Sequence, residues 1–229
     1  MRSAALASAL MLLAVPLANA AEPWQGPSAG HQHNWSGFYA GGHVSGAWGN
    51  HDATIIPAIF ILPPRTTIQQ SQDGMALGGQ VGFNYRLGSW LVGIEGAFSR
   101  AGVDGRSHME SPVDPDFVVH TVADINWFAS AVGRLGYLRD HTMVYVKGGV
   151  AKLDFDFRGY STFAGTYNGG GSLSGQRTGW TVGAGIEYAI SDAWSTRLEY
   201  GFFDFGTGRY LIDSTPIELE VRFHSVQLA

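Results

Sequence analysis

The stretch "TGWTVGAGIEYAISDAWSTRLEYGFF", residues 178–203, alternates apolar residues with small or polar ones, stops at Ser191 and Asp192, and then alternates again. Successive side chains of a β-strand point to opposite faces, so a period of two predicts two strands joined by a short turn. One face collects the apolar residues Trp180, Val182, Ile186 and Tyr188. The opposite face collects the charged residues Arg177, Glu187, Arg197 and Glu199.

The beginning of the chain has the pattern of an export signal. Arg2 is followed by the apolar run "ALASALMLLAVPLA" and by the small-residue site at 18–20, so residues 1–20 are predicted to be a cleaved signal peptide. The run is shorter than the ~20 apolar residues of a spanning helix. Residues 21–34 contain Pro, Gly and His without a period, which predicts a flexible periplasmic leader. Residues 35–229 are then the folded domain.

The composition favours strands. The chain has 229 residues with 32 glycines, 13% aromatic residues and no cysteine. Glycine and aromatic residues disfavour helices, and an exported chain without disulfides depends on burial or on a closed hydrogen-bonded sheet. Without residues 1–20 the chain has 13 basic and 19 acidic residues, and this acidic balance argues against a nucleic-acid partner. The class is therefore predicted to be all-β.

Alternating runs recur along the chain and predict eight strands. The expected strands lie within residues 35–49, 75–86, 90–99, 124–137, 142–150, 178–189, 195–203 and 217–229. Short connections alternate with long ones, which are expected over residues 49–74, 100–123, 154–174 and 204–217. Short turns at one rim and long loops at the other are typical of outer-membrane barrels.

The two faces of these strands could meet either of two solvents. In a soluble sandwich or a lipocalin-like barrel the apolar face would point inward. A membrane barrel presents it to lipid, where a central charge costs ~2–4 kcal/mol. Six of the apolar faces lack charges, aromatic residues gather near strand ends, and the polar face mixes glycine with charges of both signs. These features favour an eight-stranded antiparallel up-and-down transmembrane β-barrel.

Several segments carry a family resemblance. They are "WSGFYAGGHVSGAWG", "GGQVGFNYRLGSWLVGIEGAFS", "VGRLGYL", "VYVKGGVA", "GWTVGAGIEYAISDAWSTRLEY" and "RFHSVQLA". Together they resemble the small eight-stranded outer-membrane barrels of Gram-negative bacteria, chiefly alphaproteobacteria, called the porin family and similar to the OmpA-type transmembrane domain. The resemblance implies outer-membrane location and contact with the barrel-assembly machinery. Family members usually finish on an aromatic residue, whereas this sequence reaches Ala229, so the last strand is expected to be short.

The polar face supplies the candidate lumen residues. The predicted charged network consists of Arg86, Glu95, Arg134, Lys147, Arg177, Glu187, Arg197 and Glu199. It would either plug a narrow barrel or filter solutes, with its excess of basic residues favouring anions. The predicted aromatic girdle consists of Tyr85, Trp90, Trp127, Tyr137, Trp180, Tyr188 and Trp194.

Other motifs point to no cofactor or metal. His31 and His33, with His43 and His51 further on, come without a carboxylate or cysteine to complete a tetrahedral site and are interpreted as surface histidines. The adjacent His224 and Ser225 would point to opposite faces of one strand, which disfavours a lipid A-modifying hydrolase. The apolar segment "ATIIPAIFILPPRTT" is expected to contact lipopolysaccharide, a partner or the barrel rim.

The sequence therefore predicts a non-enzymatic, structural outer-membrane protein that supports the envelope, lies among outer-membrane lipid and lipopolysaccharide, and displays surface loops. The alternative is a porin-like diffusion channel for small solutes. A lipid A-modifying enzyme and a soluble lipocalin-like binder are less favoured. The sequence leaves the oligomeric state open.

Overall fold

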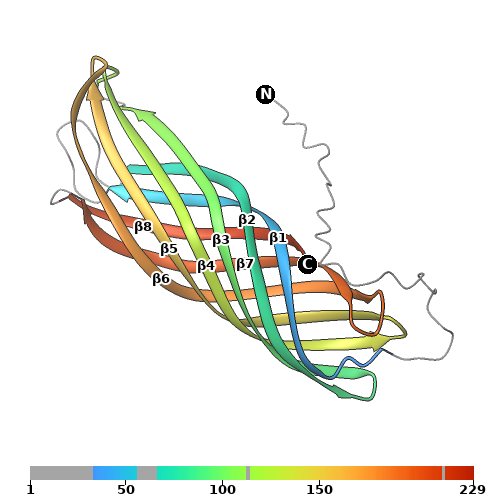
Figure 1. Cartoon of the computed structure of the whole chain (residues 1–229). Helices are drawn as coiled ribbons and strands as arrows, with labels where there is room; N and C mark the ends of the chain where they lie inside the picture. Colours follow the sequence, from blue (N-terminus) through green and yellow to red (C-terminus); the bar gives the residue numbers. More distant parts are fainter. Residues whose placement is uncertain (1–32, 56–65, 112–113, 213–214) are drawn as a thin grey trace. The chain divides into compact units, whose positions relative to one another are not determined.

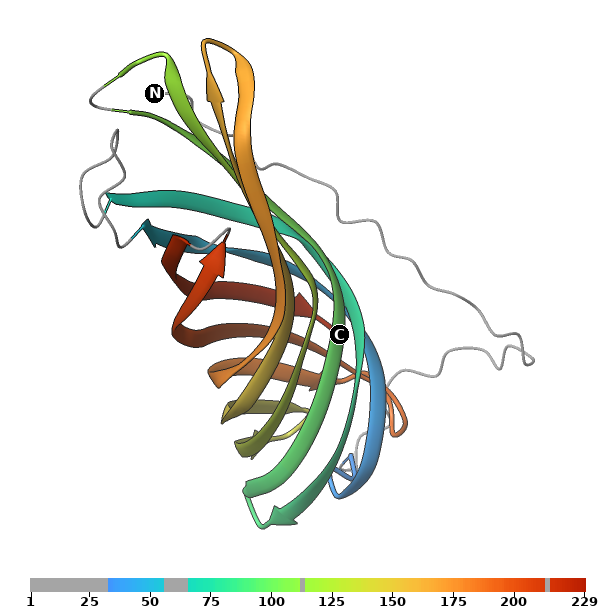
Figure 2. The ribbon, with the colours of Figure 1, turned by 90° about the vertical axis from the view of Figure 1, so that its left-hand side faces the viewer.

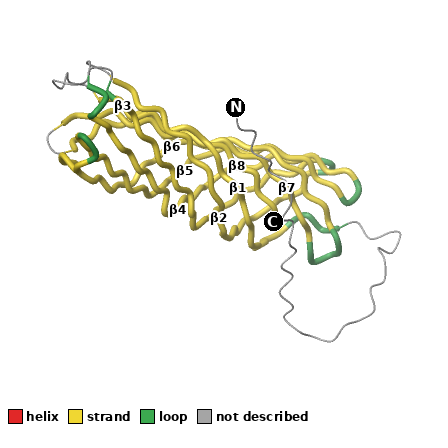
Figure 3. The backbone as a smooth tube through the Cα atoms, turned by 90° about the horizontal axis from the view of Figure 1, so that it is seen from above, coloured by secondary structure: helices red, strands yellow, loops and turns green. Residues whose placement is uncertain are grey.

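The computed structural model describes residues 33–55, 66–111, 114–212 and 215–229. Its strands are β1 (Gly37–Ile55), β2 (Thr66–Leu87), β3 (Trp90–Glu110), β4 (Phe117–Arg139), β5 (Thr142–Phe163), β6 (Thr166–Ala189), β7 (Ser195–Ile212) and β8 (Thr215–Leu228). Each strand pairs antiparallel with the next, and β8 returns to β1, so the sheet closes into the predicted eight-stranded ring (Figure 1). The tube in Figure 3 is strand along almost its whole described length. No helix among the described residues is long and apolar enough to cross a membrane.

The ring closes between β8 and β1. Their register runs from Ile217 opposite Ile55 to Leu228 opposite Val44. With 14 residues, β8 is the shortest of the eight strands, and it pairs with both β7 and β1. Residues 37–43 of β1 pair with β2 alone. Where β8 and β1 pair, closure satisfies backbone donors and acceptors that lipid cannot satisfy.

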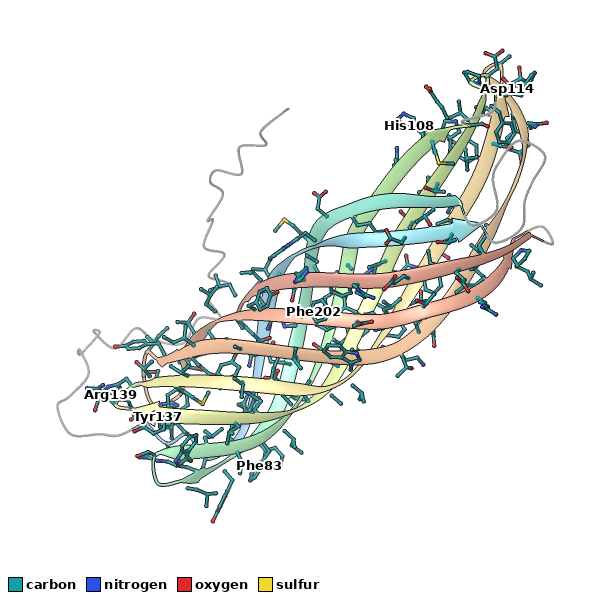
Figure 4. All side chains as sticks on the ribbon, turned by 180° about the vertical axis from the view of Figure 1, so that it is seen from behind. Phe83, His108, Asp114, Tyr137, Arg139 and Phe202 are labelled. Carbon is teal, nitrogen blue, oxygen red and sulfur yellow. The ribbon has the colours of Figure 1, made fainter. Side chains whose placement is uncertain are left out.

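The connections define two ends of the barrel. We call the end with the connections at residues 88–89, 140–141 and 190–194 the turn end, and the opposite end the hairpin end. Tyr137 and Arg139 lie near the turn end in Figure 4, whereas His108 and Asp114 lie at the hairpin end. The predicted signal peptide and most of the predicted leader lie outside the described residues, as does the core of the apolar segment, residues 56–65.

The expected long loops are largely wrong. Most of residues 100–123, 154–174 and 204–217 continue the strands, and β5 and β6 are joined by residues 164–165 alone. The alternation continues in these segments, but here the apolar side chains point into the lumen and the polar ones point outward. In β5, Val144 and Val146 point outward near the turn end, whereas Phe155 and Phe157 are buried in the lumen near the hairpin end.

This exchange of faces divides the barrel into two halves. Near the turn end the outward side chains are apolar, as lipid requires, and several inward ones are charged. Near the hairpin end the interior is apolar, and outward positions include Lys152, Asp154 and Arg158. The hairpin half therefore has the polarity of a water-soluble barrel.

Two strands, β4 and β8, depart from a simple alternation of apolar residues, for different reasons. Regular alternation would place Ile125 on the same face as Trp127, but Ile125 is buried in the lumen, because a β-bulge shifts the register between them. In β8 the apolar residues change from odd to even positions without a register shift against β1. Leu219, Val221 and Phe223 fill the apolar half of the lumen, whereas Val226 and Leu228 point outward near the turn end.

Candidate functional site: the barrel interior

Glu95 lies at the centre of a buried ion-paired network within the turn-end half. Its Oε2 accepts hydrogen bonds from Tyr39 Oη at 2.8 Å and Arg197 Nη1 at 2.5 Å, and its Oε1 accepts one from Lys147 Nζ at 3.1 Å. Arg134 Nη1 approaches the same Oε2 at 3.6 Å. These partners come from β1, β4, β5 and β7, so one carboxylate links strands on opposite sides of the ring.

Two further carboxylates complete the network. Glu187 accepts hydrogen bonds from Arg134 Nη2 at 2.9 Å and Ser195 Oγ at 2.7 Å. Glu199 accepts one from Tyr145 Oη at 2.7 Å and lies 2.6 Å from Lys147 Nζ. Three cations thus face three anions, and this balance gives the network no excess of basic charge. A buried charge is tolerated only when it is paired in this way.

Glycines make room for the two tyrosines of the network. Tyr39 lies opposite Gly82, where an added Cβ would come within 2.4 Å of the tyrosine ring. Tyr145 lies opposite Gly185, where an added Cβ would come within 2.6 Å of the phenol oxygen. These large–small pairs let each ring lie across the lumen. The Arg134 guanidinium stacks over the Tyr145 ring, 4.1 Å from its centroid.

A cluster of uncharged and histidine side chains lies beside the network. His43 is buried, with Nδ1 2.6 Å from Gln80 Oε1 and Nε2 2.8 Å from Ser99 Oγ. The side chain is therefore held by hydrogen bonds inside the barrel, so the prediction of a surface histidine is wrong for this position. Among the described residues no group of three or more His, Cys, Asp or Glu side chains is arranged to hold a metal ion.

Apolar clusters lie on both sides of the polar level. At the turn end, Trp35, Leu91, Leu138, Met143, Tyr145 and Ala189 form a small buried cluster. The larger core at the hairpin end includes stacked and edge-to-face contacts of Phe128, Phe203 and Phe223, with ring centroids 4.7–5.4 Å apart. The lumen is thus filled at three successive levels.

The structure brings six of the eight predicted lumen charges together. The exceptions are Arg86, which donates to Gly88 O at the turn-end rim, and Arg177, which donates to Leu219 O in the hairpin half. The predicted network does not include Tyr39 and Tyr145, which the structure adds to it. Their alternation phase, opposite to the lipid-facing residues, is the signal that could have identified them.

The predicted girdle residues lie at two levels. Tyr85, Trp90, Tyr137, Tyr188 and Trp194 are exposed near the turn end, and Trp90 packs edge-on against Tyr137. Trp127 and Trp180 lie farther along β4 and β6, where they contact Phe98 and Phe202. Phe202 occupies the middle of the barrel wall in Figure 4. Aromatic rings at two levels are typical of the two interfaces of a bilayer.

The adjacent His224 and Ser225 do not form a catalytic pair. Ser225 is buried in the lumen, whereas His224 lies on the outer face, where its Nδ1 is 2.6 Å from Tyr200 Oη. A nucleophilic serine needs a base within hydrogen-bond distance. The strand geometry therefore separates these two side chains, as the sequence predicts.

Fold and interior together define a transmembrane antiparallel barrel with a filled, ion-paired lumen. Comparison with known proteins identifies its family: the chain belongs to the outer membrane protein beta-barrel domain family, whose model matches residues 5–229. It is therefore an outer-membrane protein.

Named relatives agree with this assignment. The chain is 28% identical over 214 residues to the 31 kDa outer-membrane immunogenic protein of Brucella melitensis, covering 85% of this chain and 82% of that protein. It is 26% identical over 197 residues to a 22 kDa outer membrane protein of Rhizobium leguminosarum, covering 85% and 76%. Among solved structures it is similar to Ail of Yersinia pestis, with 14% identity, a TM-score of 0.32, and coverage of 81% of this chain and 98% of that one.

Proposed function

We propose that this protein is a structural, non-enzymatic outer-membrane barrel with a sealed lumen, which anchors its long hairpins outside the cell and supports the envelope. The observation that carries the proposal is the filling of the lumen at three successive levels. A solute would have to pass the apolar cluster around Leu91, the network around Glu95 and the aromatic core around Phe128. Eight strands leave an interior just wide enough for side chains, whereas aqueous channels need ~16 strands.

The orientation is part of the proposal. Outer-membrane barrels keep short turns in the periplasm and long connections outside. The apolar outer surface lies near the turn end, so the hairpin half extends beyond the lipid, where its polar outer surface meets water. In this orientation the hairpin half stands among the lipopolysaccharide headgroups.

Planar bilayer recording tests the seal. We expect the purified protein to give no conductance above the lipid background. The double variant Arg134→Ser/Glu187→Ser removes one cation and one anion together. It should also give no conductance, because the aromatic core still blocks the lumen. Each preparation must migrate faster unboiled than boiled, which shows that the barrel is folded.

Stepwise conductance of the folded wild-type protein would contradict the proposal and support the alternative of a diffusion channel. The enzymatic alternative has a separate readout. Incubation of the folded protein with lipid A should release no product, and turnover that Ser225→Ala abolishes would overturn the non-enzymatic assignment.

A further inference from the structure

The ring is incomplete at the hairpin end. The pairing of β6 with β7 begins at Ala189 opposite Ser195 and ends at Trp180 opposite Asp204, although β6 begins as early as Thr166. Among the described residues no strand pairs with Thr166–Thr178 on the side of β6 that faces β7. Figure 2 shows the β5–β6 hairpin in orange standing apart from β7 and β8 in red. Thirteen residues of β6 therefore have a free backbone edge.

A bulge in β7 produces this separation. The register of β7 against β8 shifts between Asp204 and Thr207, and Gly206 adopts φ +63°. Gly206 N donates to Asp204 Oδ1 at 2.7 Å, which fixes the bend. Bulges of this kind turn a strand away from its neighbour. Beyond the bend β7 follows β8 instead of β6.

From Gly170 onward the free edge of β6 lacks the features that usually protect an edge, whereas a bulge with Gly169 at φ +115° lies nearer the tip of the hairpin. Residues 166–176, "TYNGGGSLSGQ", contain no charge and no proline. Strand β3 also has a free edge, because its pairing with β2 ends at Asp104 although β3 continues to Glu110. Unlike the edge of β6, this edge carries the exposed charged or polar side chains of Arg106, His108 and Glu110. The edge of β7 carries the bulge and the exposed Arg209. Long, uncharged edges template the addition of another strand.

We propose that the free edge of β6 at Thr166–Thr178 docks an extended polypeptide segment of another protein as an added strand. Main-chain hydrogen bonds would hold the segment, and the two faces of β6 define its side chains. Inward, Leu173 packs against the aromatic core, and an added Cβ at Gly175 would lie 3.4 Å from the Phe155 ring. Outward, Ser172 and Ser174 are exposed to water. The partner therefore alternates apolar residues toward the lumen with polar residues toward solvent.

This inference goes beyond the proposed structural role and rests only on the pairing at the hairpin end. Conductance through the barrel would contradict the proposed sealed lumen but not this inference. Failure of β6 to bind an added strand would contradict this inference but not the sealed lumen.

The test uses the full chain in lipid nanodiscs and the synthetic peptide "LDFDFRGYSTF". This peptide copies residues 153–163 of β5, which already pair with the other edge of β6 and have the required alternation. Two N-methylated versions serve as matched probes, one modified at the positions of Asp154, Asp156 and Arg158, the other at those of Phe155, Phe157 and Gly159. In an added strand, alternate N–H groups face the protein, so only one version loses its hydrogen bonds to β6.

We expect the unmodified peptide to bind and one N-methylated version to bind at least about tenfold more weakly than the other, since each hydrogen bond contributes ~0.5–1.5 kcal/mol. Amide hydrogen exchange should slow within Thr166–Thr178 and stay unchanged in β4. Equal binding of the two methylated peptides, absence of binding, or protection elsewhere would overturn the proposal. A stable dimer that protects the same amides without peptide would also overturn it, since the edge would then pair with a second copy.

Discussion

At the scale of single residues, Glu95 makes the strongest test of the interior. Its side chain is fully buried and is the shared partner of Arg134, Lys147 and Arg197. Glu95→Gln leaves the three cations facing only two anions. Breaking a buried ion pair from one side costs ~3–5 kcal/mol, so we expect a loss of about 3 kcal/mol in the free energy of unfolding. Urea unfolding in lipid vesicles, followed by tryptophan fluorescence, measures it.

Glu218→Gln is the matched control for this prediction. Glu218 pairs with Arg209, whose side chain is 79% exposed, and such surface pairs contribute at most ~1 kcal/mol. A Glu95→Gln protein that unfolds at the same urea concentration as the Glu218→Gln protein would show that the network does not stabilise the barrel.

Asp156, on the outer face of the hairpin half, has a pKa that depends on its neighbours. Hydrogen bonds from Asn126, at 3.0 Å, and from Ser174 hold the pKa of this carboxyl below its ordinary value. The resulting stabilisation is complete above the ordinary carboxyl pKa and is lost as the pH falls through the lowered one. Asn126→Ala should raise the pKa of Asp156, measured by carbon NMR titration of its carboxyl. An unchanged titration would exclude Asn126 as the main cause.

At the scale of elements, the bulge of β7 depends on Gly206. Left-handed backbone costs ~1–2 kcal/mol for a residue with a Cβ, and φ is +63° here, so Gly206→Val should lower the free energy of unfolding by at least about 1 kcal/mol. Gly46→Val is the control, because an added Cβ at Gly46 would meet no atom within 4 Å. It should change stability by less than about 0.5 kcal/mol. Equal urea midpoints for the two variants would show that the bulge tolerates a side chain.

The elements were predictable wherever one face of a strand met lipid. Alternation located all eight strands within their turn-end halves, because a single apolar face repeats every second residue. The hairpin halves were mistaken for loops because their apolar residues, such as Phe155 and Phe157, lie on the opposite face. The bulge beside Ile125 was equally hidden, since its extra residue is one position in an otherwise regular pattern.

At the scale of the whole molecule, the sequence predicts which side chains of the candidate site point into the lumen. It does not predict how far along the barrel axis each of them lies. Phase alone assigned Arg134, Lys147 and Glu187 to the lumen, as it did Arg177. Which of these side chains meet depends on the stagger between strands, and no local pattern specifies that stagger. The register places Arg177 opposite Leu153, among apolar residues and beyond the level of Glu95.

The exchange of faces along the barrel can be tested on β5 with one kind of substitution at three positions. Val146→Lys places a charge on the apolar outer surface, at a cost of ~2–4 kcal/mol near the middle of the bilayer, and should prevent assembly. Phe155→Lys buries an unpaired charge in the aromatic core and should do the same. Asp154→Lys, between them in the sequence, points into water and should be tolerated. The fraction of outer-membrane protein that migrates faster when unboiled measures assembly. Equal assembly of the Val146→Lys and Asp154→Lys proteins would mean that the bilayer does not lie at the turn-end half, and the polar outer surface of the hairpin half would then need another explanation.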